Sequence, residues 1–196
     1  INSNYQTNFI VLSAFQEFEY AKKAINSGEY QLIILDEPVS ALDVSIQAQI
    51  VNLLKNLQKK EGFTYIFITH DISVVKYVSD EIGVMYLGDM VEKGSKNDIF
   101  TSPLHPYTLA LFSAVPIADP KVKMNRVILK GDIPSQTNPP LGCKFHTRCN
   151  KCMEICKSIE PKFVEVSKNH FVKCHLFDDK GIDSSNEDVK ELNEKE

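Results

Sequence analysis

The sequence predicts an α/β fold with a mostly parallel sheet and flanking helices, followed by a small Cys-rich C-terminal extension. Short unbroken apolar runs alternate with segments of helical periodicity over the first hundred residues, which is typical of an open α/β sheet. Four of the five cysteines crowd between residues 143 and 156. The chain has 196 residues, of which 43% are apolar and 24% charged, and this predicts one domain with an appendage.

The secondary structure is predicted element by element from these patterns. An unbroken apolar run such as Leu32 to Leu35 suits a strand that is buried on both faces of a parallel sheet. Apolar residues at helical spacing, two lysines near the end and Gly62 as a cap predict a helix before residue 62. In chain order, the expected elements are a strand at 32–35, a helix at 45–62, a strand at 65–68, a helix around 74–78, a strand at 82–87 and a return strand at 90–94.

Charge divides the chain into three zones that predict its domain organisation. Residues 1–120 are acidic and form the α/β domain, residues 121–177 are basic and form the extension, and residues 178–196 are acidic with almost no large apolar side chain. The last zone predicts a solvated, disordered tail. The lysines of the middle zone are scattered, which favours a solvated surface over a nucleic-acid site. The sequence has no run of about 18 apolar residues, and its start, which lacks Met and a signal-peptide layout, predicts a part of a longer chain.

Polar residues follow two of the expected strands. Asp36 and Glu37 come directly after the strand at 32–35, and His70 comes after the strand at 65–68. Ligands of open α/β sheets bind beyond the carboxyl ends of the strands, so these three residues are candidates for a functional site. On its own, each residue also fits a structural role, as a helix cap or as a histidine satisfied in the core.

The residues that follow Asp36 carry a family resemblance. Asp36 to Asp43, read as Asp-Glu-Pro-Val-Ser-Ala-Leu-Asp, resembles the Walker B motif and D-loop of ATP-binding cassette (ABC) ATPases, and His70 stands where that family has its switch histidine. The resemblance implies the C-terminal part of a P-loop ABC ATPase domain that uses ATP and Mg²⁺. It implies that Asp36 binds the ion, that Glu37 polarises the attacking water, that His70 contacts the γ-phosphate and that Asp43 lies at the seam between two ATPase domains.

Further segments resemble the oligopeptide/dipeptide importer branch of that family. They are Ser45–Gln49, Ser102–Thr108, Leu111–Pro116, Gly131–Ser135 and Pro139–Cys143. This resemblance implies an ATP-hydrolysing subunit that powers import of oligopeptides or dipeptides. Its implied partners are transmembrane permease subunits, a second ATPase subunit that is a paralogue and, indirectly, an external peptide-binding protein, with no nucleic acid. The implied location is peripheral, at the cytoplasmic face of the plasma membrane.

The cysteines predict a metal centre, and two interpretations remain open. From the residues alone, Cys149 and Cys152 form a CxxC knuckle that a second pair completes as a zinc site, with His146, His170 and His175 as nearby substitutes. The importer resemblance instead implies that four cysteines hold a 4Fe-4S cluster and that Cys152 is spare. These four are Cys143, Cys149, Cys156 and Cys174. Inert free thiols are the third interpretation.

Two family motifs depart from this pattern. The 196 residues contain no phosphate-binding loop of the form Gly-x-x-x-x-Gly-Lys-Ser/Thr, so we expect no ATP hydrolysis by this chain alone. At the offset of the ABC signature, the chain has Leu-Ser-Ala-Phe-Gln at 12–16, where Ser13 and Gln16 are candidate nucleotide contacts but Phe15 would obstruct close approach. Three interpretations remain open. Residues 12–16 are a degenerate form of the signature, or an insertion has moved the true signature upstream, or the match of Leu12 and Ser13 is a coincidence.

Two functions of other classes also fit the sequence. One is an ABC-type ATPase of nucleic-acid repair or translation, with the basic Cys-bearing segment as a metal-binding module. The other is a non-catalytic metal-binding fragment.

Overall fold

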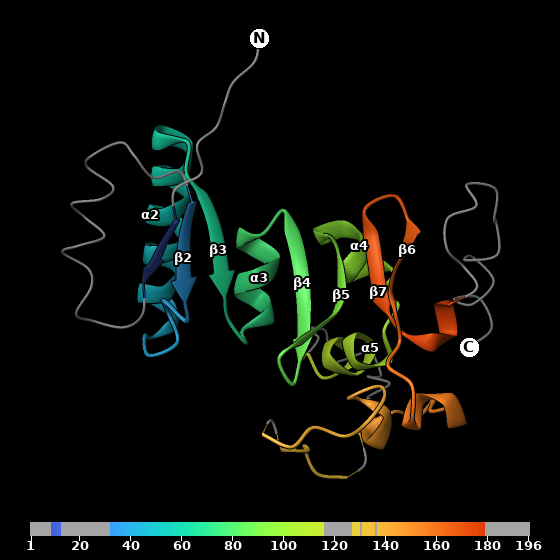
Figure 1. The fold of residues 1–196 in the computed structure, drawn as a ribbon. Coiled ribbons are helices and arrows are strands. Elements are labelled where there is room, and N and C mark those ends of the chain that lie inside the picture. The colour runs from blue at the N-terminus through green and yellow to red at the C-terminus, as the bar shows by residue number, and fades with distance from the viewer. Residues whose placement is uncertain (1–8, 13–31, 116–126, 130, 136, 179–196) are drawn as a thin grey trace, which may run out of the picture. The chain divides into compact units, whose positions relative to one another are not determined.

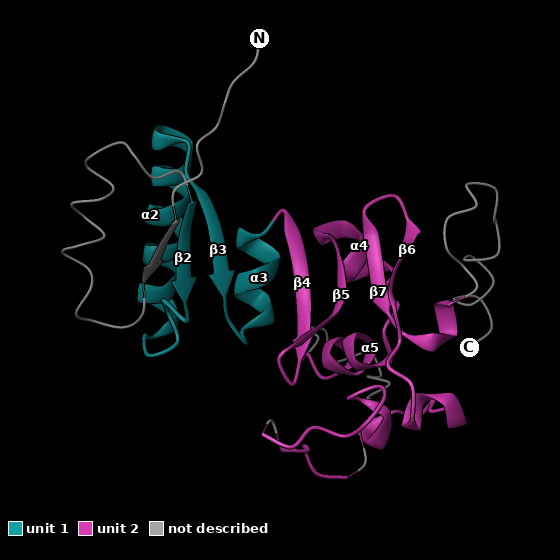
Figure 2. Cartoon of the chain, viewed as in Figure 1, with its two compact units in different colours: residues 1–79 teal, residues 80–196 magenta. Residues whose placement is uncertain are grey.

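Two β-sheets organise the residues that the computed structural model describes, which are 9–12, 32–115, 127–129, 131–135 and 137–178. The chain divides into two units, residues 1–79 and 80–196 (Figure 2). The domain boundaries predicted at residues 120 and 177 stay a prediction, and the predicted tail beyond Asp178 lies outside the described residues. No helix of the described part is long and apolar enough to cross a membrane.

Unit 1 contains a parallel sheet (Figure 1). Its strands are β1 (Phe9–Leu12), β2 (Leu32–Asp36) and β3 (Thr64–Ile68), in the order β1-β2-β3. In the register of β2 and β3, Asp36 lies opposite Ile68, so both strands end at the same edge. The strands predicted at 32–35 and 65–68 are confirmed. The short strand β1 has no counterpart among the elements predicted from the sequence.

Two helices follow β2 and β3 in unit 1. Helix α2 (Val44–Glu61) is capped by Asp43, whose side chain accepts hydrogen bonds from the backbone N–H groups of Ser45 and Ile46, both at 3.0 Å. It ends at Gly62, whose φ of 74° is the left-handed conformation that glycine adopts at little cost. Helix α3 (Ile72–Val78) follows β3. Both predicted helices are therefore confirmed, within a residue or two at their ends.

The core of unit 1 packs one face of the sheet against α2. Ile33, Leu35 and Phe63 are buried together, and Leu54 of α2 packs against them with Tyr65 and Phe67. The helical spacing of the apolar residues in α2 therefore points one stripe of the helix at the sheet.

Unit 2 contains an antiparallel sheet with the strand order β4-β5-β7-β6. Its strands are β4 (Glu81–Tyr86), β5 (Asp89–Ser95), β6 (Phe163–Ser167) and β7 (His170–Lys173), its helices are α4 (Lys96–Thr101) and α5 (Pro106–Ser113), and its short 3₁₀ helices are η1 (His146–Arg148), η2 (Glu154–Lys157) and η3 (His175–Phe177). The predicted mostly parallel arrangement therefore describes unit 1 only. Leu87 and Gly88, at φ 47° and 79°, make a two-residue turn that pairs β4 with β5 as a hairpin.

A buried carboxylate joins three segments of unit 2. Glu92 of β5 is fully buried and accepts hydrogen bonds from the backbone N–H groups of Leu104 (2.8 Å) and His105 (2.9 Å). Its Oε1 also binds His170 Nε2 of β7 at 2.8 Å. At Gly94, a Cβ would lie only 3.0 Å from the His170 ring, so glycine allows this approach. Glu92 therefore ties the start of α5 and the C-terminal hairpin to β5.

We predict that His105 makes the stability of unit 2 depend on pH. Its Nδ1 caps α5 by accepting from Tyr107 N at 3.0 Å, which requires the neutral ring, and burial lowers its pKa from 6.5 to about 4, although Glu92 opposes this shift. Because the unfolded chain binds this proton more readily, the free energy of unfolding should fall by roughly 3 kcal/mol as pH drops from about 6.5 to about 4.

The measurement is hydrogen exchange of the β5 amides at a series of pH values. His105→Asn keeps a capping side chain and removes the titrating ring, so its stability should depend less steeply on pH in this range. Parallel pH profiles for the parent chain and the variant would contradict the prediction.

Candidate functional site

The carboxyl ends of β2 and β3 bring together the three residues that were predicted from their strand-end positions. Asp36 is the last residue of β2, Glu37 follows it, and His70 lies two residues beyond the end of β3. His70 Nδ1 donates to Glu37 Oε1 at 2.9 Å, and both side chains are largely exposed. Asp36 and Glu37 are consecutive residues and both are exposed, and carboxylate oxygens suit Mg²⁺, which often uses one or two carboxylates together with phosphate oxygens.

Glu37 has a backbone conformation that is rare for a residue with a side chain. Its φ is 44°, in the left-handed region. The conformation is held on both sides: Glu37 N donates to Ile68 O at 2.9 Å, and Ser40 donates to Glu37 O from its backbone N (3.2 Å) and its Oγ (3.1 Å). Strained residues of this kind cluster at functional sites. The turn therefore directs the Glu37 carboxylate at the residues that follow β3.

The electrostatics of the pair favour an ionised Glu37. The hydrogen bond from His70 holds the pKa of Glu37 below its ordinary value, and Ser40 contributes in the same direction. A carboxylate kept ionised next to an imidazole can orient a water molecule and accept its proton. The pair is therefore chemically suited to the roles that the resemblance implies for Glu37 and His70, which stay predictions.

Of the other predicted nucleotide contacts, the structure describes Asp43 but not Ser13 or Gln16. Asp43 is exposed and its carboxylate caps α2, so a structural role is present whether or not a partner domain binds it. Leu12 is the last residue of β1, and Ser13 and Gln16 lie outside the described residues.

The Cys-bearing loops of unit 2 come together around Cys156. Cys143 N donates to Cys156 O at 2.9 Å, and Gly142, at φ 68°, approaches so closely that a Cβ there would lie 2.4 Å from the same oxygen. Cys156 and Cys174 are buried, while Cys143 and Cys149 are half-buried, and no disulfide joins the five described cysteines. The chain thus gathers thiols that are up to 31 residues apart in sequence, between Cys143 and Cys174.

Burial and mutual proximity raise the pKa values of these thiols. Desolvation raises the pKa of Cys149 to about 11 and that of Cys174 to about 12, and in both cases the neighbouring cysteines add to the shift. The pKa of Cys143 is raised for the same two reasons, with burial the larger. Without a bound cation, these groups are neutral thiols at physiological pH, and a metal ion would favour their ionised form.

The donor set fits a thiolate-bound metal in its chemistry, but its arrangement is not that of a formed site. In the described part of the chain, no three His, Cys, Asp or Glu side chains are placed so that they could hold one metal ion. The histidines considered as substitutes are engaged elsewhere: His146 with Cys143 O, His170 with Glu92, and His175 with Asp178.

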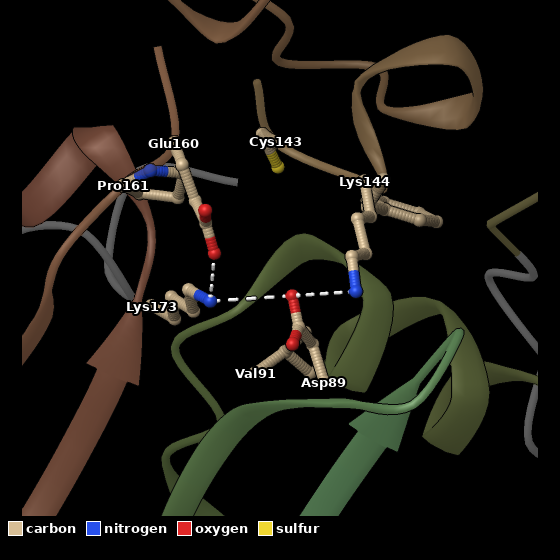
Figure 3. Close-up of a pocket in the computed structure, with 8 residues that line it drawn as sticks. Asp89, Val91, Cys143, Lys144, Glu160, Pro161 and Lys173 are labelled. Carbon is tan, nitrogen blue, oxygen red and sulfur yellow. Dashed lines mark hydrogen bonds and ion pairs between the residues drawn. The ribbon is translucent and has the colours of Figure 1, made fainter. Parts of the chain in front are cut away.

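An ion-pair network beside Cys143 was not predicted from the sequence. Figure 3 shows a small pocket in which Asp89 Oδ2 binds both Lys144 Nζ and Lys173 Nζ at 3.2 Å, and Lys173 also binds Glu160. The two lysines hold the pKa of Asp89 below its ordinary value, although burial opposes this. Nothing in the sequence pairs Asp89 with lysines that lie 55 and 84 positions away.

The aromatic contacts that hold the loop between Cys143 and Cys149 were also not predicted from the sequence. Phe145 is almost completely buried and contacts three rings, those of Tyr86, His105 and Tyr107. The segment His105-Pro106-Tyr107 therefore has a packing role: it holds the loop between Cys143 and Cys149 against the β4–β5 hairpin.

We predict that His70→Ala raises the pKa of the Glu37 carboxyl group toward its ordinary value, because the variant removes the hydrogen bond that lowers it. The stabilisation from this pair is present above the ordinary carboxyl pKa and is lost as pH falls through the lowered folded value. A ¹³C NMR titration of the Glu37 carboxyl carbon measures the change. An unchanged Glu37 pKa in His70→Ala would show that the pair does not form.

Comparisons with known proteins identify chains that are similar in sequence. Residues 91–156 match the model of the family described as oligopeptide/dipeptide transporter, C-terminal region. The chain is 55% identical over 149 residues to the oligopeptide transport ATP-binding protein AppF of Bacillus subtilis, covering 75% of this chain and 45% of that protein. It is 56% identical over 148 residues to the oligopeptide transport ATP-binding protein OppF of Haemophilus influenzae, covering 74% of this chain and 45% of that protein.

The chain spans about half the length of the curated relatives it matches. The match confirms the resemblance predicted from motifs such as Ser102–Thr108. Residues 91–156 thus match the C-terminal region of oligopeptide/dipeptide transporters, and about three quarters of this chain is homologous to oligopeptide transport ATP-binding proteins.

Proposed function

We propose that this chain is the C-terminal part of an ATP-hydrolysing subunit that powers the import of oligopeptides or dipeptides. The observation that carries the proposal is the hydrogen bond between Glu37 and His70 at the ends of adjoining parallel strands, directly after Asp36. The relatives named above, which are oligopeptide transport ATP-binding proteins, support the same reading.

In this proposal, each residue of the strand-end site has a defined task. Mg²⁺ bound with ATP supplies charge neutralisation on the phosphates. Asp36 offers an exposed carboxylate to the ion or its water. Glu37, kept ionised by His70, orients the attacking water and accepts its proton, while His70 fixes the direction of the carboxylate. Asp43, at the start of α2, contacts the partner ATPase domain.

The proposed partners are those of an importer: permease subunits, a second ATPase subunit and, through the permease, an external peptide-binding protein. The proposed location is the cytoplasmic face of the plasma membrane. The nucleic-acid alternative is less well supported, because Lys144 and Lys173 of the basic segment are neutralised by Asp89 and Glu160 rather than free to bind phosphates.

We predict that Glu37→Gln abolishes ATP hydrolysis and preserves ATP binding, since the amide keeps the shape of the side chain but cannot accept the proton. The test uses a chimera of the B. subtilis relative in which residues 32–178 of this chain replace the matching segment. Hydrolysis should fall by about 10²-fold or more. Glu61→Gln, on the exposed end of α2, is the control and should hydrolyse ATP at the parent rate. Parental turnover in Glu37→Gln would contradict the proposed role.

We further propose that Cys143, Cys149, Cys156 and Cys174 hold one metal centre, a 4Fe-4S cluster, with zinc as the alternative. The support is that four thiols from separate loops share one neighbourhood, with the Cys143 backbone fixed to Cys156. Thiolates suit both metals. When bound, the centre would cross-link a segment that has little core of its own.

The metal proposal is tested on this chain by anaerobic purification and by analysis of iron, sulfide and zinc. We predict iron with matching sulfide and a brown chromophore that is lost in Cys156→Ser and kept in Cys152→Ser, because Cys152 is the spare thiol. Zinc without sulfide would contradict the cluster and retain a metal centre. The absence of metal after anaerobic reconstitution would contradict both.

A further inference from the structure

His70 directly precedes Asp71, the N-cap of helix α3, and apolar burial contributes little to holding this helix against the rest of unit 1. The helix has seven residues, and none of them is fully buried. Its aliphatic residues Val74, Val75 and Val78 are half-buried. A helix of this length gains little from its own hydrogen bonds. Its position therefore depends on specific contacts with its surroundings.

Those contacts converge on Tyr77. Lys55 Nζ of α2 donates to Tyr77 O at 2.7 Å and lies 4.2 Å from the centroid of the Tyr77 ring. The Tyr77 hydroxyl donates to Asn52 Oδ1 of α2 at 2.8 Å. We call Asn52, Lys55 and Tyr77 the α2–α3 clamp. Each contact is exposed and weak alone, but three contacts at one residue fix both the distance and the rotation of α3 against α2.

The other end of α3 fixes the backbone of His70. Asp71 Oδ1 caps the helix by accepting from Ser73 N (2.8 Å) and Val74 N (3.3 Å). Asp71 N in turn donates to Thr69 Oγ1 at 3.1 Å. His70 thus lies between Thr69 and Asp71, which are bound to each other, and Asp71 is also bound to the first turn of α3. Its backbone has to follow any displacement of the helix.

The His70 side chain has little else to hold it. It is 74% exposed and its ring binds Glu37 Oε1. A ring with so few neighbours reaches its partner only if its backbone is correctly placed. A displacement of the backbone by about 1 Å can cost a reaction a large factor in rate.

We infer that the α2–α3 clamp positions His70 against Glu37, which makes Lys55 and Tyr77 positioning residues for the reaction proposed above. The inference rests on the proposed function only for the importance of the Glu37–His70 pair, because the contacts themselves lie within this chain. Asp43 caps the start of helix α2, so the clamp connects His70 to the helix that follows the predicted partner contact. A shift of α2 on partner binding would then reach His70 through Tyr77.

The test measures the geometry of the pair directly, by ¹⁵N NMR of the His70 ring in this chain at one fixed pH, because the hydrogen bond to Glu37 holds the ring proton on Nδ1. Lys55→Met and Tyr77→Leu should each shift the His70 ring toward the tautomer mixture of a free imidazole, because His70 is released. Lys60→Met removes a charge of the same sign from the same helix at an exposed ion pair with Glu61, and should leave the His70 ¹⁵N shifts unchanged. Lys55→Arg, which keeps the cation and its hydrogen bonds, should keep the parent shifts.

Two further measurements distinguish a failure of the clamp from a failure of the proposed function. Tyr77→Phe removes only the hydroxyl bond to Asn52 and reports on the clamp if a larger change unfolds the helix. In the chimera, Tyr77→Phe should lower kcat about tenfold with KM for ATP unchanged. Parental His70 ¹⁵N shifts in Lys55→Met and Tyr77→Phe would overturn the inference. Changed His70 shifts together with full ATP hydrolysis by Glu37→Gln would support the clamp and overturn the proposed function instead.

Discussion

The parallel register of β2 and β3 is the constraint on which the strand-end site depends. It places Asp36 opposite Ile68, and the hydrogen bond from Glu37 N to Ile68 O continues the ladder by one residue. That bond forces Glu37 into a left-handed conformation and turns its carboxylate toward His70. A slip of one residue would move every side chain of β2 to the opposite face and separate the pair. The chemistry proposed here is therefore a consequence of strand pairing.

Unit 2 depends in a similar way on one buried group. Glu92 receives two backbone donors and the His170 ring, and leaving any of these unsatisfied in the interior costs about 1–3 kcal/mol. The same network orients His105 and Tyr107, and Phe145 of the loop between Cys143 and Cys149 packs against both rings. The position of the gathered thiols thus depends on a carboxylate whose hydrogen-bond partners, Leu104, His105 and His170, include none of the cysteines.

The sequence predicted those features that arise from local pattern. Apolar runs located β2 and β3 and helical spacing located α2, so the strand-end residues followed from position alone. The roles of Glu92 and Asp89 were missed, because their partners lie up to 84 residues away and a single carboxylate in a strand or turn gives no periodic signal. The strand at 82–87 and its return strand at 90–94 were predicted and form the antiparallel pair β4–β5, but the pairing of β5 with β7 was missed, because its partner residues lie about 80 positions away.

The central claim is that a nucleotide-bound metal sits at the ends of β2 and β3. Paramagnetic relaxation by Mn²⁺–ATP in the chimera tests this most directly, since Mn²⁺ replaces Mg²⁺ at oxygen ligands and broadens nearby resonances. The account predicts the strongest broadening at Asp36, Glu37 and His70, with a weaker effect at Lys60 and Glu61 at the far end of α2. Strong broadening at Lys60 and Glu61 with none at Asp36 and Glu37 would contradict it.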